Sequence, residues 1–445
     1  MKILLVMPAI KPNASLYEKL LLKLTMWSSI TLQQLYALTD DKHEVKIIDE
    51  NYEKIRYDGN YDLVAISTFT STAFRAYEIA DRFRGKGIKV VLGGYHPTAL
   101  PEEAKQHADA VVIGEAEGVW QTLLEDAEKD DLKPFYISNP VSGEEIISPV
   151  ENKYFSIVKG VEATRGCINR CNFCAISNSL IGCKFRKKPI ERVIKEIENL
   201  KCKSFVFYDS SLTIDAKYTK ELFKRLKELN KNFACFGNAN VLARDEELLK
   251  LAYDAGCVAW AVGFESVLQS TLSSIGKRNR VDDYEKVVKK VNEYGMALIA
   301  SFVFGFDNDT EDVFNETLNA LYKWNVDSIG VNILTPFPGT PLFRQLDNEG
   351  RILTKNWSKY DLYHVVHLPK RMTPEKLYNG VKMLAENFFS FSNILKKIMG
   401  KKFDFITRAS LSYHLFTSRA VYKAVFKEKE EIVSKENLCK AIIRI

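Results

Sequence analysis

Short apolar segments alternate with helical patterns through most of this chain, and that alternation limits the fold more than any other feature. Strands that alternate with helices form a parallel sheet, whose ligands sit beyond the carboxyl ends of the strands. In the first part of the chain, helical patterns end near residue 38 and cover 73–84, and the apolar segments cover residues 2–6, 44–48, 63–67, 88–92 and 110–113. We therefore expect a doubly wound, Rossmann-like α/β domain over residues 1–140.

A second alternating series follows a stretch without periodicity. Its six apolar segments cover residues 160–163, 204–208, 233–236, 259–263, 297–304 and 328–334. Six β/α units predict a partial TIM-type barrel, (β/α)6, over residues 153–356, with its chemistry on the loops that follow the strands. From residue 357 to 445 the pattern is helical and aromatic, and Pro374-Glu375 is typical of a helix start.

The composition is that of an ordinary globular protein, with 46% hydrophobic and 27% charged residues. The first apolar run ends at Pro8 without a cleavage site, and no apolar stretch is long enough to cross a bilayer. Outside one cluster the cysteines are scattered singly, as in proteins whose thiols stay reduced. We therefore expect a cytoplasmic protein.

Cys167, Cys171 and Cys174 form a CxxxCxxC cluster just after the first barrel strand, so one loop supplies three thiolates. Three cysteines bind three irons of a 4Fe-4S cube and leave the fourth iron open for an exchangeable ligand. A structural zinc site prefers four ligands, and Cys183 is the only further cysteine nearby. The cluster therefore favours 4Fe-4S, with zinc or redox thiols as the alternative.

The cysteine motif and its position resemble the radical S-adenosylmethionine (SAM) superfamily, in which the open iron binds the amino and carboxylate groups of SAM. Phe173 matches the aromatic residue that the family places against adenine. Gly263-Phe-Glu265-Ser266 matches the family's fourth-strand motif, and Phe304-Gly305-Phe306-Asp307 matches the end of the fifth. The SAM contacts implied by the resemblance are Phe173, Asp209, Ser210, Asn238, Glu265, Ser266, Ser301 and Gly305. The alternatives are loop packing for Phe173, a helix cap for Asp209, and core hydrogen bonds for Asn238 and Ser301.

The amino-terminal domain resembles the cobalamin-binding domain fused to many radical SAM enzymes. Gly93-Gly94-Tyr95-His96-Pro97-Thr98 and Gly114-Glu115-Ala116-Glu117 match that group, in the branch of hopanoid methylases and the anaerobic chlorophyll cyclase. The loop that gives cobalt a lower histidine elsewhere is absent, so the resemblance implies cobalamin without a histidine from the protein. The implied contacts are Met7, Ser67, Thr68, Phe69, Thr70, Gly93, Gly94, His96, Gly114, Glu115 and Glu117. The alternative is a Rossmann-like lid that binds nothing.

The resemblance implies a reaction that starts with reductive cleavage of SAM to a 5′-deoxyadenosyl radical. The radical takes hydrogen from an unactivated carbon of a small molecule, which then receives a methyl group from methylcobalamin. The electron comes from an external donor of the flavodoxin or ferredoxin type. The alternatives are a radical SAM cyclase or rearranging enzyme without methyl transfer, and a cobalamin-dependent sensor or binding module. No catalytic acid or base is assigned.

Basic residues gather near the carboxyl end, where 16 Lys and Arg stand against 7 Asp and Glu from Lys370 onward. Lys396, Lys397, Lys401 and Lys402 are accompanied by apolar side chains, namely Phe388, Phe389, Phe391, Ile394, Leu395, Ile398, Phe403, Phe405, Leu411, Leu415 and Phe416. A basic, aromatic helix pair is typical of a protein that lies on an anionic bilayer. The prediction is a lipidic substrate and peripheral membrane contact, with no nucleic acid. The alternative is a helical face that packs on the barrel.

Overall fold

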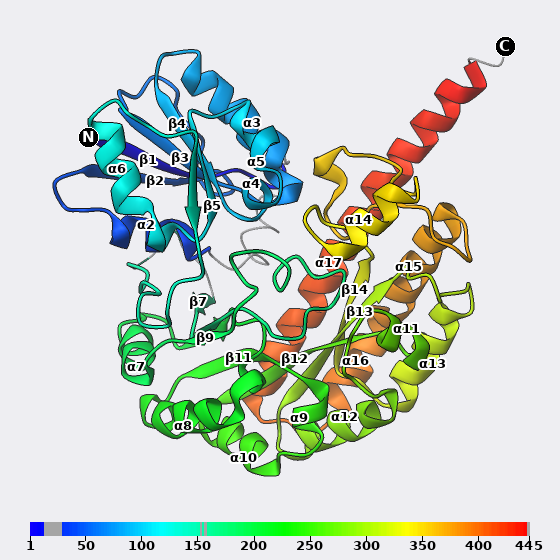
Figure 1. Ribbon diagram of the computed structural model, residues 1–445. Coiled ribbons are helices and arrows are strands. Elements are labelled where there is room, and N and C mark those ends of the chain that lie inside the picture. Colours follow the sequence, from blue (N-terminus) through cyan, green and yellow to red (C-terminus); the bar gives the residue numbers. More distant parts are fainter. Residues whose placement is uncertain (13–28, 152–153, 155–157, 443–445) are drawn as a thin grey trace.

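The computed structural model describes residues 1–12, 29–151, 154 and 158–442, and the side chains as far as residue 426. Its ribbon shows an amino-terminal α/β body, blue to cyan, beside a larger body that holds the rest of the chain (Figure 1). Part of the helix predicted before residue 38 falls on residues 13–28, outside the described residues. Among the described residues, no helix combines the length and apolar character needed to cross a membrane.

The amino-terminal body is a six-stranded sheet in the order β2-β1-β3-β4-β5-β6, with every neighbouring pair parallel. Its strands are β1 (Lys2–Met7), β2 (Glu44–Asp49), β3 (Leu63–Ser67), β4 (Lys89–Gly93), β5 (Ala110–Gly114) and β6 (Phe135–Ser138). Its helices are α2 (Thr31–Leu38), α3 (Ala73–Arg84), α4 (Tyr95–Ala99), α5 (Pro101–Lys105) and α6 (Trp120–Glu128). The strand order reverses between β1 and β3, which is where doubly wound sheets bind ligands.

Alternate residues of these strands fill two separate cores, one on each face of the sheet. Leu4 and Val64 pack with α3 on one face, and Ile3 and Leu63 pack with α2 and α6 on the other. A parallel sheet covered on both faces needs apolar residues at nearly every position. This requirement explains the continuous apolar runs of the sequence and confirms the doubly wound prediction.

The larger body is a second parallel sheet in the order β14-β13-β12-β11-β10-β7, which confirms the predicted six-stranded partial barrel. Its strands are β7 (Lys159–Val161), β10 (Ser204–Phe207), β11 (Asn232–Gly237), β12 (Cys257–Glu265), β13 (Ala297–Phe304) and β14 (Ser328–Ile333). Its helices are α7 (Ile190–Glu198), α8 (Ala216–Leu226), α9 (Ala239–Leu242), α10 (Glu246–Asp254), α11 (Gln269–Ser274), α12 (Tyr284–Glu293) and α13 (Val313–Lys323). A short antiparallel hairpin, β8 (Thr164–Arg165) with β9 (Arg186–Lys187), follows β7.

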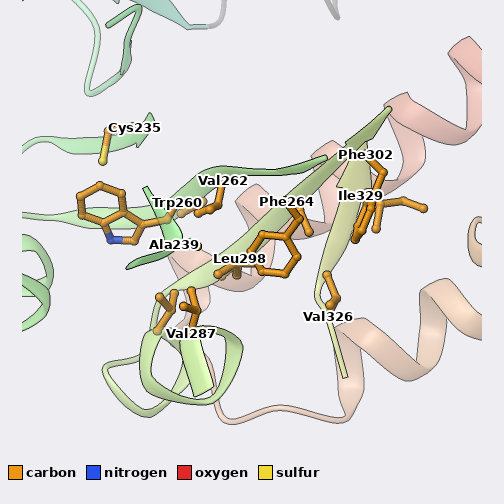
Figure 2. Packing of buried hydrophobic residues seen from close by; sticks show 14 of the residues in the cluster. Cys235, Ala239, Trp260, Val262, Phe264, Val287, Leu298, Phe302, Val326 and Ile329 are labelled. Carbon is orange, nitrogen blue, oxygen red and sulfur yellow. The ribbon is translucent and has the colours of Figure 1, made fainter. Parts of the chain in front are cut away.

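The main core of the barrel lies between its strands and the surrounding helices. Figure 2 shows Trp260, Val262 and Phe264 of β12 in this layer, beside Leu298 of β13 and Val287 of α12. Because successive residues of a strand point to opposite faces, the intervening Ala261 and Gly263 face the inside of the barrel.

The carboxyl-terminal segment packs into the cores of both bodies. Its helices are α14 (Pro341–Asn348), α15 (Pro374–Phe388), α16 (Phe391–Met399) and α17 (Phe405–Ile442). The predicted start at Pro374 is confirmed, and Thr373 caps α15 by accepting a hydrogen bond from the Lys376 amide at 3.2 Å. Leu377 and Leu411 join the barrel core, whereas Trp357 joins a core of the amino-terminal sheet.

Candidate functional site

The three motif cysteines lie on the loop between β8 and β9. Asn178 organises this loop, because its side-chain amide donates to the carbonyl oxygens of Cys171 at 2.9 Å and Cys174 at 2.8 Å. All three cysteines line one cavity of about 830 Å³, the cluster cavity, which fills the inside of the barrel. Cys183 is not among the residues that line it.

The arrangement of the thiols fits an iron-sulfur cube better than a single metal ion. Among the described residues, no three His, Cys, Asp or Glu side chains converge closely enough to hold one ion. A zinc ion requires its ligands around one point, whereas each cysteine of a 4Fe-4S cluster binds its own iron. Cys167, Cys171 and Cys174 are all free of disulfides. Three thiols on one loop match the three protein ligands of a 4Fe-4S cluster with one open iron.

Lys277 is a cation of the cluster cavity that the sequence analysis missed. Its ammonium lies 2.8 Å from Oε1 of Glu265, and the two side chains are 13% and 11% exposed. Burial acts to lower the pKa of Lys277, but Glu265 and the nearby thiols raise it above its ordinary value. Burial also raises the pKa of Cys171 to about 11, an effect that Lys277 opposes. The site therefore holds a charged lysine beside the cysteine loop.

Glu265 occupies its position because β12 is irregular there. The pairing of β12 with β13 shifts between Gly263 and Glu265, and Glu265 has a left-handed backbone with φ of 64°. Such a conformation is uncommon outside glycine and is found at functional sites. A Cβ atom on Gly263 would lie 2.3 Å from Oε1 of Glu265, so a larger residue would force the carboxylate to shift from its place beside Lys277. Glycine at this position lets the carboxylate keep that place.

The other predicted SAM contacts divide into two groups. Phe173, Ser210, Asn238 and Ser301 line the cluster cavity together with Glu265. Asp209, Ser266 and Gly305 are not among its lining residues, and each has a partner elsewhere.

Asp209 is 2% exposed and anchors the β8 hairpin. Its carboxylate accepts hydrogen bonds from Oγ1 of Thr164 at 2.5 Å, from the Thr164 amide, and from the Ala163 amide at 3.3 Å. Burial raises the pKa of Asp209 to about 7. Asp209 therefore holds the start of the cysteine loop and does not line the cluster cavity.

Ser266 and Gly305 likewise serve the local backbone. The Ser266 hydroxyl accepts from the Leu268 amide at 3.1 Å, which forms the turn after β12. The Gly305 carbonyl lies 3.0 Å from Nε2 of His367, and a Cβ on Gly305 would lie 2.8 Å from Leu377 of α15. Ser266 is therefore explained by the turn after β12, and Gly305 by packing against the carboxyl-terminal segment.

A second cavity, the interdomain cavity, lies between the two bodies. The loops after β3, β4 and β5 and helix α2 form one side, and Glu162, Arg165, Ile181 and Tyr208 form the other. Eight predicted cobalamin contacts line it, namely Ser67, Thr68, Phe69, Gly93, Gly94, Gly114, Glu115 and Glu117. It therefore lies at the carboxyl ends of the strands, beside the topological switch point, as ligands of such sheets do.

Met7, Thr70 and His96 are not among the lining residues of this cavity. His96 is fully buried, and its Nε2 lies 3.0 Å from the Tyr77 hydroxyl and 3.2 Å from Glu103. Trp357 packs edge-on against the ring and donates to the same carboxylate at 2.8 Å. These contacts hold His96 outside the cavity lining and attach the carboxyl-terminal segment to the first sheet.

Gly94 has a steric role in the backbone of the cavity wall. A Cβ there would lie 2.6 Å from the Thr68 carbonyl oxygen, and φ is +102°. The glycine therefore allows the loops after β3 and β4 to approach each other.

Arg165, which sequence analysis did not single out, joins the two bodies. Its guanidinium lies 2.8 Å from Glu162, 2.8 Å from Glu117 and 3.3 Å from Glu115, and its side chain is 12% exposed. Arg186 adds a 2.7 Å pair to Glu115. Although burial acts to lower the pKa of Arg165, the carboxylates raise it well above its ordinary value. A charged network therefore connects the loop after β5 with the hairpin that carries the cysteines.

Family models match both bodies of the chain. The radical SAM superfamily model matches residues 161–321, and the B12 binding domain model matches residues 27–124. The first match implies a 4Fe-4S cluster and SAM, and the second implies cobalamin. Radical SAM enzymes act on small molecules and require a reductant.

Two methyltransferases match over most of their length, and a cyclase matches over a smaller part. The bacteriochlorophyllide d C-12(1)-methyltransferase of Chlorobaculum tepidum is 31% identical, over 88% of this chain and 89% of its own. The C-8(2)-methyltransferase of the same organism is 31% identical, over 91% and 96%. The anaerobic magnesium-protoporphyrin IX monomethyl ester cyclase of Cereibacter sphaeroides is 26% identical, over 74% and 60%.

A solved structure shares the fold. It is the radical SAM methyltransferase TsrM from Kitasatospora setae with cobalamin and a [4Fe-4S] cluster bound, at a TM-score of 0.69 and 14% identity. The match covers 95% of this chain and 99% of that one. The 31% identity to the two methyltransferases over most of both chains, together with the two family models, shows that the chain belongs to the cobalamin-dependent radical SAM methyltransferase family.

Proposed function

We propose that the protein methylates an unactivated carbon of an apolar small molecule held in the cluster cavity. The observation that carries this proposal is that one segment of chain borders both cavities. Arg165 and Ile181 line the interdomain cavity, and Cys167, Cys171 and Cys174, which lie between them, line the cluster cavity. A methyl carrier in the first cavity and a substrate in the second are thereby brought to opposite sides of one loop.

The cofactors of the family supply an electron for cleavage of SAM and a carrier for its methyl group. The residues of this chain bind the cofactors and orient them toward the substrate. Cys167, Cys171 and Cys174 are the proposed iron ligands. Lys277 offers an ammonium to a carboxylate, and Asn238 and Ser210 offer polar groups to the rest of SAM. The ring of Phe173 packs edge-on against that of Phe306, with the ring centroids 5.7 Å apart. This contact holds the Phe173 ring as a flat surface for the adenine of SAM.

The proposed cobalamin site takes no histidine from the protein. Of the described histidines, His96 comes nearest in sequence to the cavity residues, and its Nε2 is engaged by Tyr77 and Glu103. Phe69 and Tyr95, which line the cavity, have nearly parallel rings 6.1 Å apart. The absorption spectrum of bound methylcobalamin should therefore be that of a form to which the protein supplies no histidine nitrogen.

Separate measurement of 5′-deoxyadenosine and S-adenosylhomocysteine tests the proposed reaction. A methylase of this kind forms both products, because SAM supplies the radical and also the methyl group. A cyclase, for which the cyclase relative is the precedent, forms 5′-deoxyadenosine alone, and a binding module forms neither. Formation of 5′-deoxyadenosine alone with the true substrate would replace our proposal with the cyclase.

We also propose that the electron comes from a flavodoxin- or ferredoxin-type donor.

We further propose that the protein contacts a membrane. Six exposed apolar side chains on α16 and α17 support this contact, and we call them the apolar rim: Phe391, Leu395, Met399, Phe405, Ile406 and Phe416. Lys396 and Lys402 are exposed nearby. Lys397 and Lys401 differ from the prediction, because they bind Asn325 and Asp327 of the barrel.

A further inference from the structure

The inside of the barrel is lined by rows of small side chains. Residues paired across a parallel ladder point to the same face, so the strand registers define these rows. The row nearest the cysteine loop is Gly263, Ser301 and Gly330. The next row is Phe236, Ala261 and Ile299. The third row is Val206, Ala234, Ala259 and Ala297. Apart from Val206, Phe236 and Ile299, every member is alanine, glycine or serine.

These small residues leave the barrel hollow. In complete TIM barrels, layers of bulky branched side chains fill the same space. Here Ala261, Gly263, Ser301 and Gly330 keep partial exposure, whereas the alternate residues Trp260 and Val262 are at most 1% exposed. The cluster cavity runs from Cys167 at one end to Val258, near the start of β12, at the other. At about 3.3 Å per residue, the distance from Val258 to Glu265 is about 23 Å.

The two ends of the cavity differ in charge, because the end away from the cysteines is lined by uncharged side chains, both apolar ones and the polar Ser204, Asn232, Ser410 and His414. Lys277, Glu265 and Asn238 lie at the end that carries the cysteines. The opposite end, which we call the base, is closed by the first turns of α17, where Phe405 and Ile406 line the cavity. These two residues are also 85% and 44% exposed to solvent, so they form a thin wall between the cavity and the outside.

We infer that the barrel interior binds a slim apolar chain of the methyl-accepting substrate. The accepting carbon lies at the cysteine end, and the chain ends at the base, beside Phe405 and Ile406. Barrels of this size are only wide enough for the side chains that usually fill them, so the missing side chains leave the width of a chain. This inference rests on the proposed function and adds the class of substrate: a molecule with an extended alkyl or isoprenoid-like tail.

The binding of a fluorescent polyene fatty acid to the full-length protein with its cluster tests the inference. Straight-chain fatty acids of increasing length should displace this probe more strongly until the chain fills the cavity. Gly330→Leu and Ala261→Leu place a branched side chain in the first and second rows. A Cβ on Gly330 meets Ser301 no closer than 3.4 Å, so the local backbone tolerates the change. Each variant should weaken binding by about tenfold or more.

Ala320→Leu is the matched control, because Ala320 is half-buried on α13 and outside the cavity. It should bind the probe as the unchanged protein does. Equal thermal midpoints for all variants show that the folds are intact. The inference would be overturned if binding did not depend on chain length, or if Gly330→Leu and Ala261→Leu bound the probe as the control does.

Photolabelling tests which end of the bound fatty acid lies at the base of the cavity. A fatty acid with a diazirine at its apolar end should label peptides that contain Phe405 to Tyr413, since these residues close the base. Labelling of the cysteine loop instead would contradict the proposed direction. Failure of the proposed function would give a different result: no S-adenosylhomocysteine would form, while probe binding would still depend on chain length.

Discussion

The three motif cysteines carry the first prediction at the scale of single residues. Replacement of Cys167, Cys171 and Cys174 by alanine should abolish the cluster and with it SAM cleavage, since each thiolate holds one iron. Iron content and the visible spectrum of anaerobically reconstituted protein measure this. Cys202→Ala and Cys183→Ala are controls outside the cavity and should keep the iron. A triple variant that kept its iron and still cleaved SAM would disprove the assignment.

Loss of the Lys277 cation should destabilise the protein. Lys277→Met leaves the carboxylate of Glu265 buried without a partner, which costs about 3 kcal/mol or more. Urea unfolding of the cluster-free protein measures this cost. Lys277→Met with Glu265→Gln should recover most of it, because no buried charge then remains.

Lys289→Met is the matched control for Lys277. Lys289 is 76% exposed and lies 3.8 Å from Glu293, so its loss should cost under about 1 kcal/mol. An equal effect of the two single variants would show that the Lys277 pair is not effectively buried.

Asp209 predicts a pH dependence of stability. Its pKa in the folded protein is about 7, above the ordinary 3.8, so the folded state favours the protonated form. The contribution of Asp209 to the free energy of unfolding is complete below about pH 4. It falls as the pH rises to about 7, by at most about 4 kcal/mol. Asp209→Asn should therefore flatten the stability curve between about pH 5 and about pH 7.

Asp215→Asn is the control with the opposite sign. Burial raises the pKa of Asp215, but hydrogen bonds from Lys187 and Tyr218 leave it below its ordinary value. Its contribution is lost only in more acidic solution, so the curve between about pH 5 and about pH 7 should keep its shape. Unfolding in urea across this range compares the two. A curve unchanged by Asp209→Asn would refute the raised pKa.

The sequence predicts single site residues well only where they follow each other closely. Cys167, Cys171 and Cys174 share one loop, so their spacing is enough to predict their convergence. Lys277 lies beyond α11, and no periodic pattern indicates that its side chain returns to Glu265. His96 lies in α4, a helix of one turn, and the direction of a side chain in so short an element depends on contacts with residues as distant as Trp357.

At the scale of elements, the β8–β9 hairpin should hold the two bodies together through Arg165. Arg165→Met leaves Glu162 and Glu117 buried without their partner, which costs about 3–5 kcal/mol. Hydrogen exchange should increase in the loop after β5, and cobalamin retention should fall. Arg225→Met removes an exposed pair with Glu191 and should have little effect. Unchanged exchange in the Arg165 variant would exclude this role.

Most strands of both sheets could be predicted because parallel strands covered on both faces are continuous apolar runs. The exceptions are short. β6 has four residues at the sheet edge, and β8 and β9 have two each, too few to show a pattern. Helix α17 was expected as a basic and aromatic surface. Its pattern shows two faces, but the sequence alone does not reveal that Leu411 and Leu415 enter the barrel core while Phe405 and Phe416 stay exposed.

At the scale of the whole molecule, the apolar rim predicts binding to anionic vesicles. Binding should be strongest at low salt, because Lys396 and Lys402 are then least screened. Leu395→Glu with Met399→Glu should abolish co-sedimentation. Tyr322→Glu is the control, since Tyr322 is 45% exposed on α13, away from the rim. Intact protein that stays in solution at low salt would mean that the substrate arrives from water.

The attachment of Trp357 to the first sheet affects synthesis on the ribosome. The amino-terminal strands emerge first, yet one of their cores includes Phe343, Trp357, Tyr360 and Val366. Helix α3 covers part of that face early, but at about 5–20 residues per second the remainder waits through translation of the entire barrel. We therefore expect the nascent chain to expose an apolar patch of the first sheet during this interval, which a chaperone near the exit tunnel could bind.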